Sequence, residues 1–273
     1  MMRQRFFPFS GLLLLIMSCT TARHAAQVQE PSVSIKPTTA TLDKFGYLYY
    51  GNTQQEIYKI DKDGNEQGYY SNNRLGNVSI IDVTNPLKIL VYFQDFFTGI
   101  FLDRQLNETS RFNMIDLGYG QIEVVGSSLD GALWIFDDHA QRLNKVDQQG
   151  GVLQRGQDLR LLFNERLRPI KIVEANGMLH LLVPNRGLLL FDLFGQYQTQ
   201  VLLPDLRDFQ ILDNLMVYTT DDQLFKYSFQ THLSTLVWET TIQNGEKMLW
   251  SGGDQISLVS KEGIKKLQLT AKN

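Results

Sequence analysis

Residues 130–147, DGALWIFDDHAQRLNKVD, decide the fold of this chain. The pair Asp130-Gly131 lies between apolar runs, which is a strong local cue for a β-hairpin turn. The run ALWIFDD that follows is short and rich in large apolar residues, and RLNKVD is a further run after the polar loop Asp137 to Gln141. Short apolar runs bounded by turn-forming residues are typical of strands. The stretch therefore predicts consecutive antiparallel strands.

The same unit occurs six times along the chain. Its central runs begin at Tyr47, Leu87, Ala132, Met178, Leu215 and Gln255, so the repeat is about 40 residues long. A turn signal comes before each central run, and another apolar run follows it. A repeat of this length with four strands is the signature of a β-propeller blade. We therefore predict an all-β chain, a β-propeller of six four-stranded blades over residues 33–273.

Two parts of this propeller need separate predictions. The last repeat has only three strands before the chain ends at Asn273, so we expect the N-terminal segment VSIK, Val33 to Lys36, to supply the missing strand and close the ring. The stretch Arg155 to Pro169 fits the repeat less well. It is compatible with either a short amphipathic helical turn or a long loop between the third and fourth blades.

The N-terminus has the layout of an export signal. Arg3 and Arg5 form a positive region, and Leu12 to Met17 form an apolar run too short to span a membrane. The residues that end at Cys19 resemble a bacterial lipobox, which implies a signal peptide over 1–18 and diacylation of Cys19. The alternative is an incidental cysteine in an ordinary signal peptide. Residues 19–32 contain few large apolar side chains, which predicts a flexible tether.

The blades resemble an uncharacterised family of β-propeller lipoproteins from Bacteroidota envelopes. The resemblance rests on DVTNPLKILVYFQDF at 82–96 and GLLLFDLFGQ at 187–196. The residue after Cys19 is Thr20, whereas an aspartate at this position would resemble an inner-membrane retention signal. The acidic cluster that would resemble a surface-export signal is also missing after Cys19. These resemblances imply a lipid-anchored protein of the outer membrane that faces the periplasm. A formal net charge of −3 argues against nucleic acid as a partner.

Motifs for catalysis or metal binding find little support in the sequence. There is no G-x-S-x-G pattern, and the single cysteine is assigned to the lipid anchor. The histidines His24, His139, His180 and His232 are not paired at metal-ligand spacing, and His180 is expected to pack within a strand. In DKDGN, Asp61 to Asn65, the glycine is fourth rather than sixth, which favours a turn over a calcium loop. We predict no cofactor and no metal.

The loops between the second and third strands of all blades should emerge on one face. Two large apolar residues, Phe96 and Phe97, fall in the second blade's loop, and Arg186 and His139 lie on loops of the same face. Aromatic residues and arginine are favoured at protein interfaces, so these four residues are candidate partner-binding residues. The alternative is that one phenylalanine caps the channel and the other packs on a neighbouring blade. The aspartates Asp137, Asp138, Asp221 and Asp222 suit either a cation or solvated turns.

Together these features predict a non-enzymatic protein-binding scaffold, anchored to the outer membrane and acting with an envelope protein in cell-envelope biogenesis. A propeller offers a rigid ring with loops on two faces, and this chain supplies mixed polar and aromatic loops. Two alternatives stay open. A metal-dependent lyase or lactonase requires acidic or histidine side chains from at least three blades to converge in the channel, and a glycan- or peptide-binding lipoprotein requires aromatic side chains along one groove.

Overall fold

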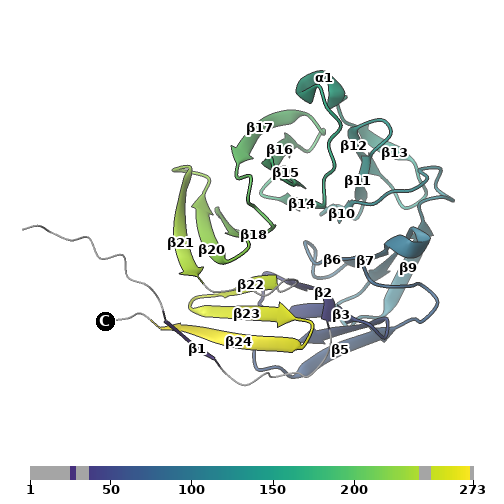
Figure 1. Ribbon diagram of the computed structural model, residues 1–273. Helices are drawn as coiled ribbons and strands as arrows, with labels where there is room; N and C mark the ends of the chain where they lie inside the picture. Colours follow the sequence, from purple (N-terminus) through teal and green to yellow (C-terminus); the bar gives the residue numbers. More distant parts are fainter. Residues whose placement is uncertain (1–24, 29–36, 240–246, 271–273) are drawn as a thin grey trace, which may run out of the picture.

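A computed structural model describes residues 25–28, 37–239 and 247–270 and contains six four-stranded antiparallel sheets arranged as a ring (Figure 1). The predicted all-β, six-bladed propeller is confirmed. In five of the sheets the strands follow one another in chain order from the innermost to the outermost position, and in the sixth the outermost strand comes from the N-terminus. Among the residues that the structure describes, no helix has the length and apolar character needed to span a bilayer.

The first three blades cover residues 37–155. Blade 1 contains β2 (Pro37–Leu42), β3 (Leu48–Asn52), β4 (Glu56–Ile60) and β5 (Glu66–Ser71). Blade 2 contains β6 (Ile80–Asp82), β7 (Ile89–Phe93), β8 (Thr98–Leu102) and β9 (Glu108–Asn113), with the 3-10 turn η1 (Gln94–Phe96). Blade 3 contains β10 (Val125–Ser127), β11 (Leu133–Asp137), β12 (Arg142–Val146) and β13 (Val152–Arg155).

The remaining blades follow the same order. Blade 4 contains β14 (Lys171–Ala175), β15 (Met178–Val183), β16 (Gly187–Asp192) and β17 (Tyr197–Leu202), and the short helix α1 (Arg160–Phe163) precedes it. Blade 5 contains β18 (Asp208–Leu212), β19 (Leu215–Thr219), β20 (Gln223–Ser228) and β21 (Leu233–Glu239). Blade 6 contains β22 (Lys247–Gly252), β23 (Gln255–Ser260), β24 (Gly263–Thr270) and β1 (Ala25–Val28).

An N-terminal strand closes the ring, as predicted, but it is not the predicted segment. β1 pairs antiparallel with β24, with Ala25 opposite Thr270 and Val28 opposite Leu267. The expected segment, Val33 to Lys36, lies outside the described residues, and β1 falls within the stretch expected to be a tether. A closing strand is held by backbone hydrogen bonds to its neighbour, so a sequence such as AAQV serves without an apolar pattern that would reveal it.

The core is divided among the interfaces between neighbouring blades. Strand β7 is buried at all five positions because blades cover both faces of its sheet, which explains why such strands appear in the sequence as continuous apolar runs. One core cluster joins Tyr49 and Ile57 of blade 1 to Ile81 and Ile100 of blade 2, and similar clusters occupy the other interfaces. Packing between blades therefore stabilises the whole ring.

Aspartate residues shape the turns between third and fourth strands. Asp61 Oδ1 accepts hydrogen bonds from the backbone N–H groups of Asp63 and Asn65, both at 2.9 Å. Asp103, Asp147 and Asp192 make the same pair of bonds in blades 2, 3 and 4. The DKDGN segment is thus a hydrogen-bonded turn, as the position of its glycine predicted.

The antiparallel order of the strands gives the ring two different faces. The turns between first and second strands and between third and fourth strands emerge together on what we call the turn face, at 43–47, 61–65, 83–88, 103–107, 128–132, 147–151, 176–177, 193–196, 213–214, 229–232 and 253–254. The loops between second and third strands and the connections between blades emerge on the loop face, at 53–55, 72–79, 94–97, 114–124, 138–141, 156–170, 184–186, 203–207, 220–222 and 261–262.

Candidate functional site

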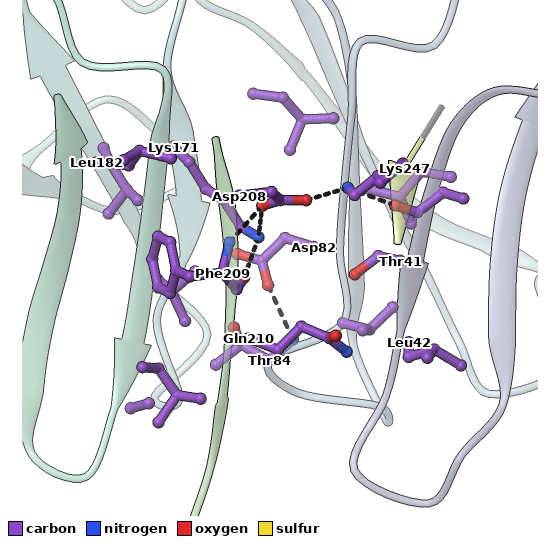
Figure 2. Close-up of a pocket in the computed structure, with 18 of the residues that line it drawn as sticks. Thr41, Leu42, Asp82, Thr84, Lys171, Leu182, Asp208, Phe209, Gln210 and Lys247 are labelled. Carbon is purple, nitrogen blue, oxygen red and sulfur yellow. Dashed lines mark hydrogen bonds and ion pairs between the residues drawn. The ribbon is translucent and has the colours of Figure 1, made fainter. Parts of the chain in front are cut away.

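The innermost strands enclose a central channel with a volume of about 730 Å³. Its wall includes Thr41 of β2, Asp82 of β6, Lys171 of β14, Asp208 of β18 and Lys247 of β22, and Figure 2 shows the charged side chains directed toward one another. A cavity of this size suits a small molecule or a short peptide segment. Its polar groups are therefore the first place to look for chemistry.

Asp208 lies between two lysines at the centre of this wall (Figure 2). Its Oδ1 atom is 2.6 Å from Lys171 Nζ, and its Oδ2 atom is 2.7 Å from Lys247 Nζ. Lys171 also donates to the carbonyl of Phe209 at 2.6 Å, and Lys247 donates to the carbonyl of Ala40 at 2.7 Å. These contacts connect blades 4, 5, 6 and 1.

The two lysines determine the ionisation of Asp208. Burial by itself would raise the pKa of Asp208, but Lys171 and Lys247 outweigh it and hold that pKa well below its usual range. Burial lowers the pKa of Lys171, and the neighbouring Asp208 opposes this shift. Because both oxygens of the carboxylate are occupied by ammonium groups, Asp208 is at neutral pH a charged link between blades rather than an available proton acceptor.

Two further acids near the channel also join neighbouring blades. Asp82 Oδ2 accepts the backbone N–H of Ser127 at 2.6 Å, and burial raises the pKa of Asp82. Glu174 Oε2 accepts bonds from Trp134 Nε1 at 2.6 Å and from Ser128 Oγ at 2.7 Å. Among the described residues, no three His, Cys, Asp or Glu side chains lie close enough together to hold a metal ion.

The two phenylalanines on the loop face have different environments. Phe96 ends the 3-10 turn η1 and is 54% exposed, whereas Phe97 is partly buried against the core between blades 2 and 3. Phe97 adopts a left-handed backbone conformation, with φ at 50°. This tight turn directs the two side chains into different environments. Phe96 thus stays a candidate contact residue, and Phe97 is a packing residue.

Arg186 is held against the connection between blades 3 and 4. Its Nε atom donates to Glu165 Oε1 at 2.9 Å, and its guanidinium lies 4.8 Å from the centre of the Phe163 ring. Phe163 in turn meets Tyr197 edge to face, with ring centres 5.3 Å apart. Arg186 therefore supports this connection as well as lining the loop face.

The connection itself contains α1 and presents two leucines to solvent. The segment Arg155 to Pro169, which was compatible with a helical turn or a loop, forms one helical turn within a longer loop. Leu161 is 85% exposed and Leu162 is 49% exposed. These leucines are not among the residues predicted from the sequence. The available signal was their position in a segment rich in charged residues, but an apolar pair there has no repeat position that fixes whether it points inward.

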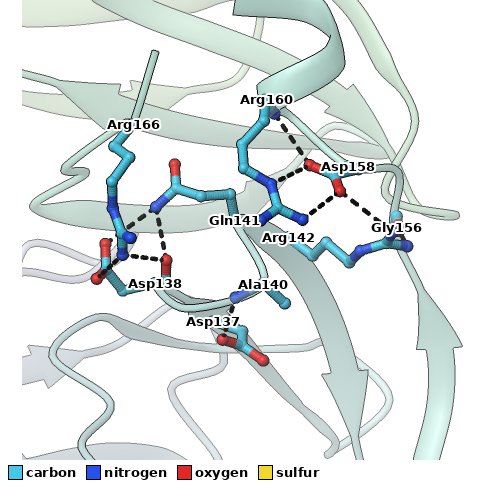
Figure 3. A network of polar contacts seen from close by, with 9 residues as sticks. All are labelled: Asp137, Asp138, Ala140, Gln141, Arg142, Gly156, Asp158, Arg160 and Arg166. Carbon is cyan, nitrogen blue, oxygen red and sulfur yellow. Dashed lines mark hydrogen bonds and ion pairs between the residues drawn. The ribbon is translucent and has the colours of Figure 1, made fainter. Parts of the chain in front are cut away.

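A buried glutamine attaches this connection to blade 3 (Figure 3). Gln141 is fully buried; its Oε1 accepts the backbone N–H of Leu167 at 2.6 Å, and its Nε2 donates to the carbonyl of Asp138 at 2.8 Å. Arg166 donates to Asp138 Oδ2 at 2.6 Å. Beside α1, Arg160 lowers the pKa of Asp158 to about 2 through a direct hydrogen bond. We call residues 156–170, which contain α1, the α1 platform; Gln141 and Asp138 of blade 3 support it.

The other residues considered from sequence are placed as follows. His139 is exposed on the same loop as Gln141, and no hydrogen bond in the described part of the chain joins it to Phe96 or Arg186. His180 packs between Phe209 and Phe229, and burial lowers its pKa to about 4. Of the aspartates weighed as cation ligands, Asp138 pairs with Arg166 and Asp221 pairs with Arg207. Cys19 lies outside the described residues.

Comparison with known proteins identifies the fold but no family. The sequence matches no protein-family model and no curated protein. The structure is similar to a streptogramin B lyase, with a TM-score of 0.63, 12% identity, and coverage of 90% of this chain and 98% of that one. It is also similar to virginiamycin B lyase from Staphylococcus aureus (TM-score 0.61, 11% identity, coverage 91% and 100%). A protein of unknown function from Bacteroides caccae shares the fold (TM-score 0.53, 14% identity, coverage 78% and 81%).

Proposed function

We propose that this chain is a lipid-anchored, non-enzymatic protein-binding scaffold of the bacterial cell envelope, and that the α1 platform is its partner-binding surface. The observation that carries the proposal is the exposure of Leu161, 85%, on a helical turn whose base is fixed by the fully buried Gln141. An apolar side chain displayed on a rigid support is typical of an interface anchor.

The energetics favour a partner at this position. Burying one leucine side chain is worth about 1.5 to 3 kcal/mol, which corresponds to about a tenfold to hundredfold change in an association constant. Because hydrogen bonds and ion pairs already order the α1 platform, a partner does not have to order it on binding. Arg186 lies beside the platform and adds the kind of cationic side chain that interfaces favour.

The polar groups of the channel support a binding role in another way. Asp208 is saturated by Lys171 and Lys247, and Asp82 is occupied by the backbone of Ser127. In each case the acid joins blades to one another. These groups make the ring rigid, which is what a scaffold needs in order to present loops at fixed positions.

The proposed address follows from the N-terminal sequence. A lipid on Cys19, which resembles the acylated residue of a lipobox, would anchor the chain to the outer membrane on its periplasmic side. The partner would then be another envelope protein. This assignment also explains how an exported chain with one cysteine avoids an unpaired thiol.

The second candidate function is that of a lyase acting in the central channel. It is favoured by the similarity of this propeller to two lyases, and the channel volume is adequate for a small substrate. Such a reaction needs an acid or base that is not committed to structural bonds. The engagement of Asp208 and Asp82 makes the scaffold the stronger proposal.

Affinity purification of the tagged lipoprotein from its native membrane tests the scaffold. We expect one stable partner whose recovery falls about tenfold or more in Leu161→Ser, because the buried leucine contact is lost. Leu233→Ser is the matched control, since Leu233 is 66% exposed on the outer edge of blade 5. Equal partner recovery by both variants would reject the α1 platform as the binding surface.

The anchor has a separate test. The Cys19→Ala variant should fold normally and be largely released from the membrane fraction, because it lacks the acyl chains that supply most of the membrane affinity. Mass spectrometry of the mature wild-type N-terminus should show a diacylated cysteine. An N-terminus without lipid would exclude this mode of anchoring.

A further inference from the structure

The position of β1 determines from which face the chain enters the propeller. Ala25 pairs with Thr270, the last residue of β24. β24 is the third strand of blade 6, and third strands run from the loop face to the turn face. Figure 1 shows β1 beginning beside the end of β24. Residue 25 therefore lies at the turn face.

The distance available between Cys19 and this entry point is short. Cys19 precedes Ala25 by six residues, and a fully extended chain spans at most about 3.6 Å per residue, so the reach is about 20 Å. β24 has eight residues, which corresponds to a blade about 26 Å deep. A lipid on Cys19 would therefore keep the turn face close to the bilayer, while the loop face cannot reach the same surface.

The turn face carries a set of protruding apolar side chains on four consecutive blades. Phe45, Leu87 and Leu129 lie on the turns between first and second strands of blades 1, 2 and 3, and they are 68%, 71% and 55% exposed. Phe194 lies on the turn between the third and fourth strands of blade 4 and is 64% exposed. None of these side chains is needed to fill a core, and each comes from a separate turn.

We propose that the turn face rests on the lipid bilayer and inserts Phe45, Leu87, Leu129 and Phe194 into its interfacial region; the anchoring part of this inference rests on the acylation of Cys19 proposed above. A fluid surface accommodates apolar tips that protrude from separate blades, because lipids rearrange around each one. The short reach from Cys19 to Ala25 adds an independent reason for a lipid occupant. The α1 platform, on the loop face, then points away from the membrane.

Charge on the turn face indicates how it binds. Lys44 lies 5.3 Å from the ring centre of its neighbour Phe45, which suits the boundary between headgroups and acyl chains. The aspartates of this face, such as Asp61 and Asp103, are turned back to bind backbone N–H groups. The turns of this face contain eight aspartates against three lysines and one arginine, so apolar insertion rather than attraction to anionic lipid should drive binding. Added salt should therefore not weaken binding.

Site-specific fluorescence on the full lipidated protein tests this orientation. Phe45→Cys, Leu129→Cys and, as the loop-face control, Leu161→Cys each introduce one free thiol for an environment-sensitive dye, because a lipidated Cys19 has none. In vesicles of phosphatidylethanolamine and phosphatidylglycerol, we expect a blue-shifted emission and protection from an aqueous quencher at positions 45 and 129 but not at 161. Equal quenching at all three positions, or protection at 161 alone, would overturn the inference.

A second experiment separates this inference from the anchor. The unlipidated Cys19→Ala protein should still bind the same vesicles weakly, and adding Leu87→Ser with Leu129→Ser should reduce that binding by about tenfold or more. A mature wild-type N-terminus that carries no lipid in mass spectrometry would reject the anchor. Identical vesicle binding by the two unlipidated proteins would instead reject membrane contact by the turn face. Dye protection at position 45 by a co-purified protein without vesicles would also reject it.

Discussion

Trp134 of blade 3 donates its indole N–H to the carboxylate of Glu174 in blade 4 at 2.6 Å, and both residues are buried. Side chains join each of the five remaining pairs of neighbouring blades in a similar way. The bonds are Lys59 to the Arg104 carbonyl (blades 1 and 2), Asp82 to the Ser127 N–H (2 and 3), Lys171 to Asp208 (4 and 5), Lys247 to Asp208 (5 and 6) and Lys247 to the Ala40 carbonyl (6 and 1). The ring therefore has a polar link at each interface in addition to its apolar core.

Removing the carboxylate of Glu174 should destabilise the propeller strongly. In Glu174→Ala, the indole of Trp134 and the hydroxyl of Ser128 lose their acceptor while remaining buried, and each unsatisfied donor costs about 1 to 3 kcal/mol. We expect the free energy of unfolding in urea to fall by about 3 kcal/mol or more. The exposed Glu123→Ala should change it by less than about 0.5 kcal/mol. A loss of the same size in both variants would contradict the assigned role.

Asp208→Asn should destabilise the ring in a manner that depends on pH. At neutral pH the substitution leaves Lys171 and Lys247 without their counter-charge, at a cost of about 3 kcal/mol. Because folding lowers the pKa of Asp208, its stabilising effect is present above the unfolded pKa of about 3.9 and is lost as the pH falls toward the folded value. The difference in the free energy of unfolding between wild type and Asp208→Asn, measured in urea, should therefore shrink below about pH 4. A difference that does not change with pH would refute this role of Asp208.

Asp82→Asn should show the opposite dependence on pH. Burial raises the pKa of Asp82, so its contribution to stability is fully present below the unfolded pKa of about 3.9 and declines as the pH rises through the folded value. The stability of wild type relative to Asp82→Asn should thus decrease as the pH rises above about 4. A stability difference that instead increases with pH, as expected for Asp208→Asn, would show that the burial of Asp82 has been misjudged.

Deleting Ala25 to Val28 should weaken the ring more than deleting Thr20 to Arg23. The first deletion removes β1 and exposes the backbone of β24 as a sheet edge, whereas the second removes the same number of residues that precede the strand. At a net value of about 1 kcal/mol for each hydrogen bond, we expect a loss of a few kcal/mol and a tendency to aggregate. Equal melting temperatures for the two deletions would mean that β1 does not close the ring.

Phe96 and Phe97 should respond differently to substitution by serine. Phe97 packs against the core between blades 2 and 3, so Phe97→Ser should lower the free energy of unfolding by about 2 to 4 kcal/mol. Phe96 is exposed, so Phe96→Ser should change the free energy by less than about 0.5 kcal/mol. Thermal or urea unfolding measures both values. A large loss for Phe96→Ser would assign that residue to packing and remove it from the candidate interface.

The sequence by itself determined the number of blades, the positions of their strands and the nature of their turns. These features depend on local causes: strands covered on both sides become continuous apolar runs, and turns use Asp, Asn and Gly for their own backbone geometry. The tertiary structure alone decided which polar groups meet. Lys171, Asp208 and Lys247 lie in three different repeats and come together only because the ring closes. The same holds for β1, whose partner β24 is at the other end of the chain, and for α1, whose exposed leucines depend on the distant anchor at Gln141.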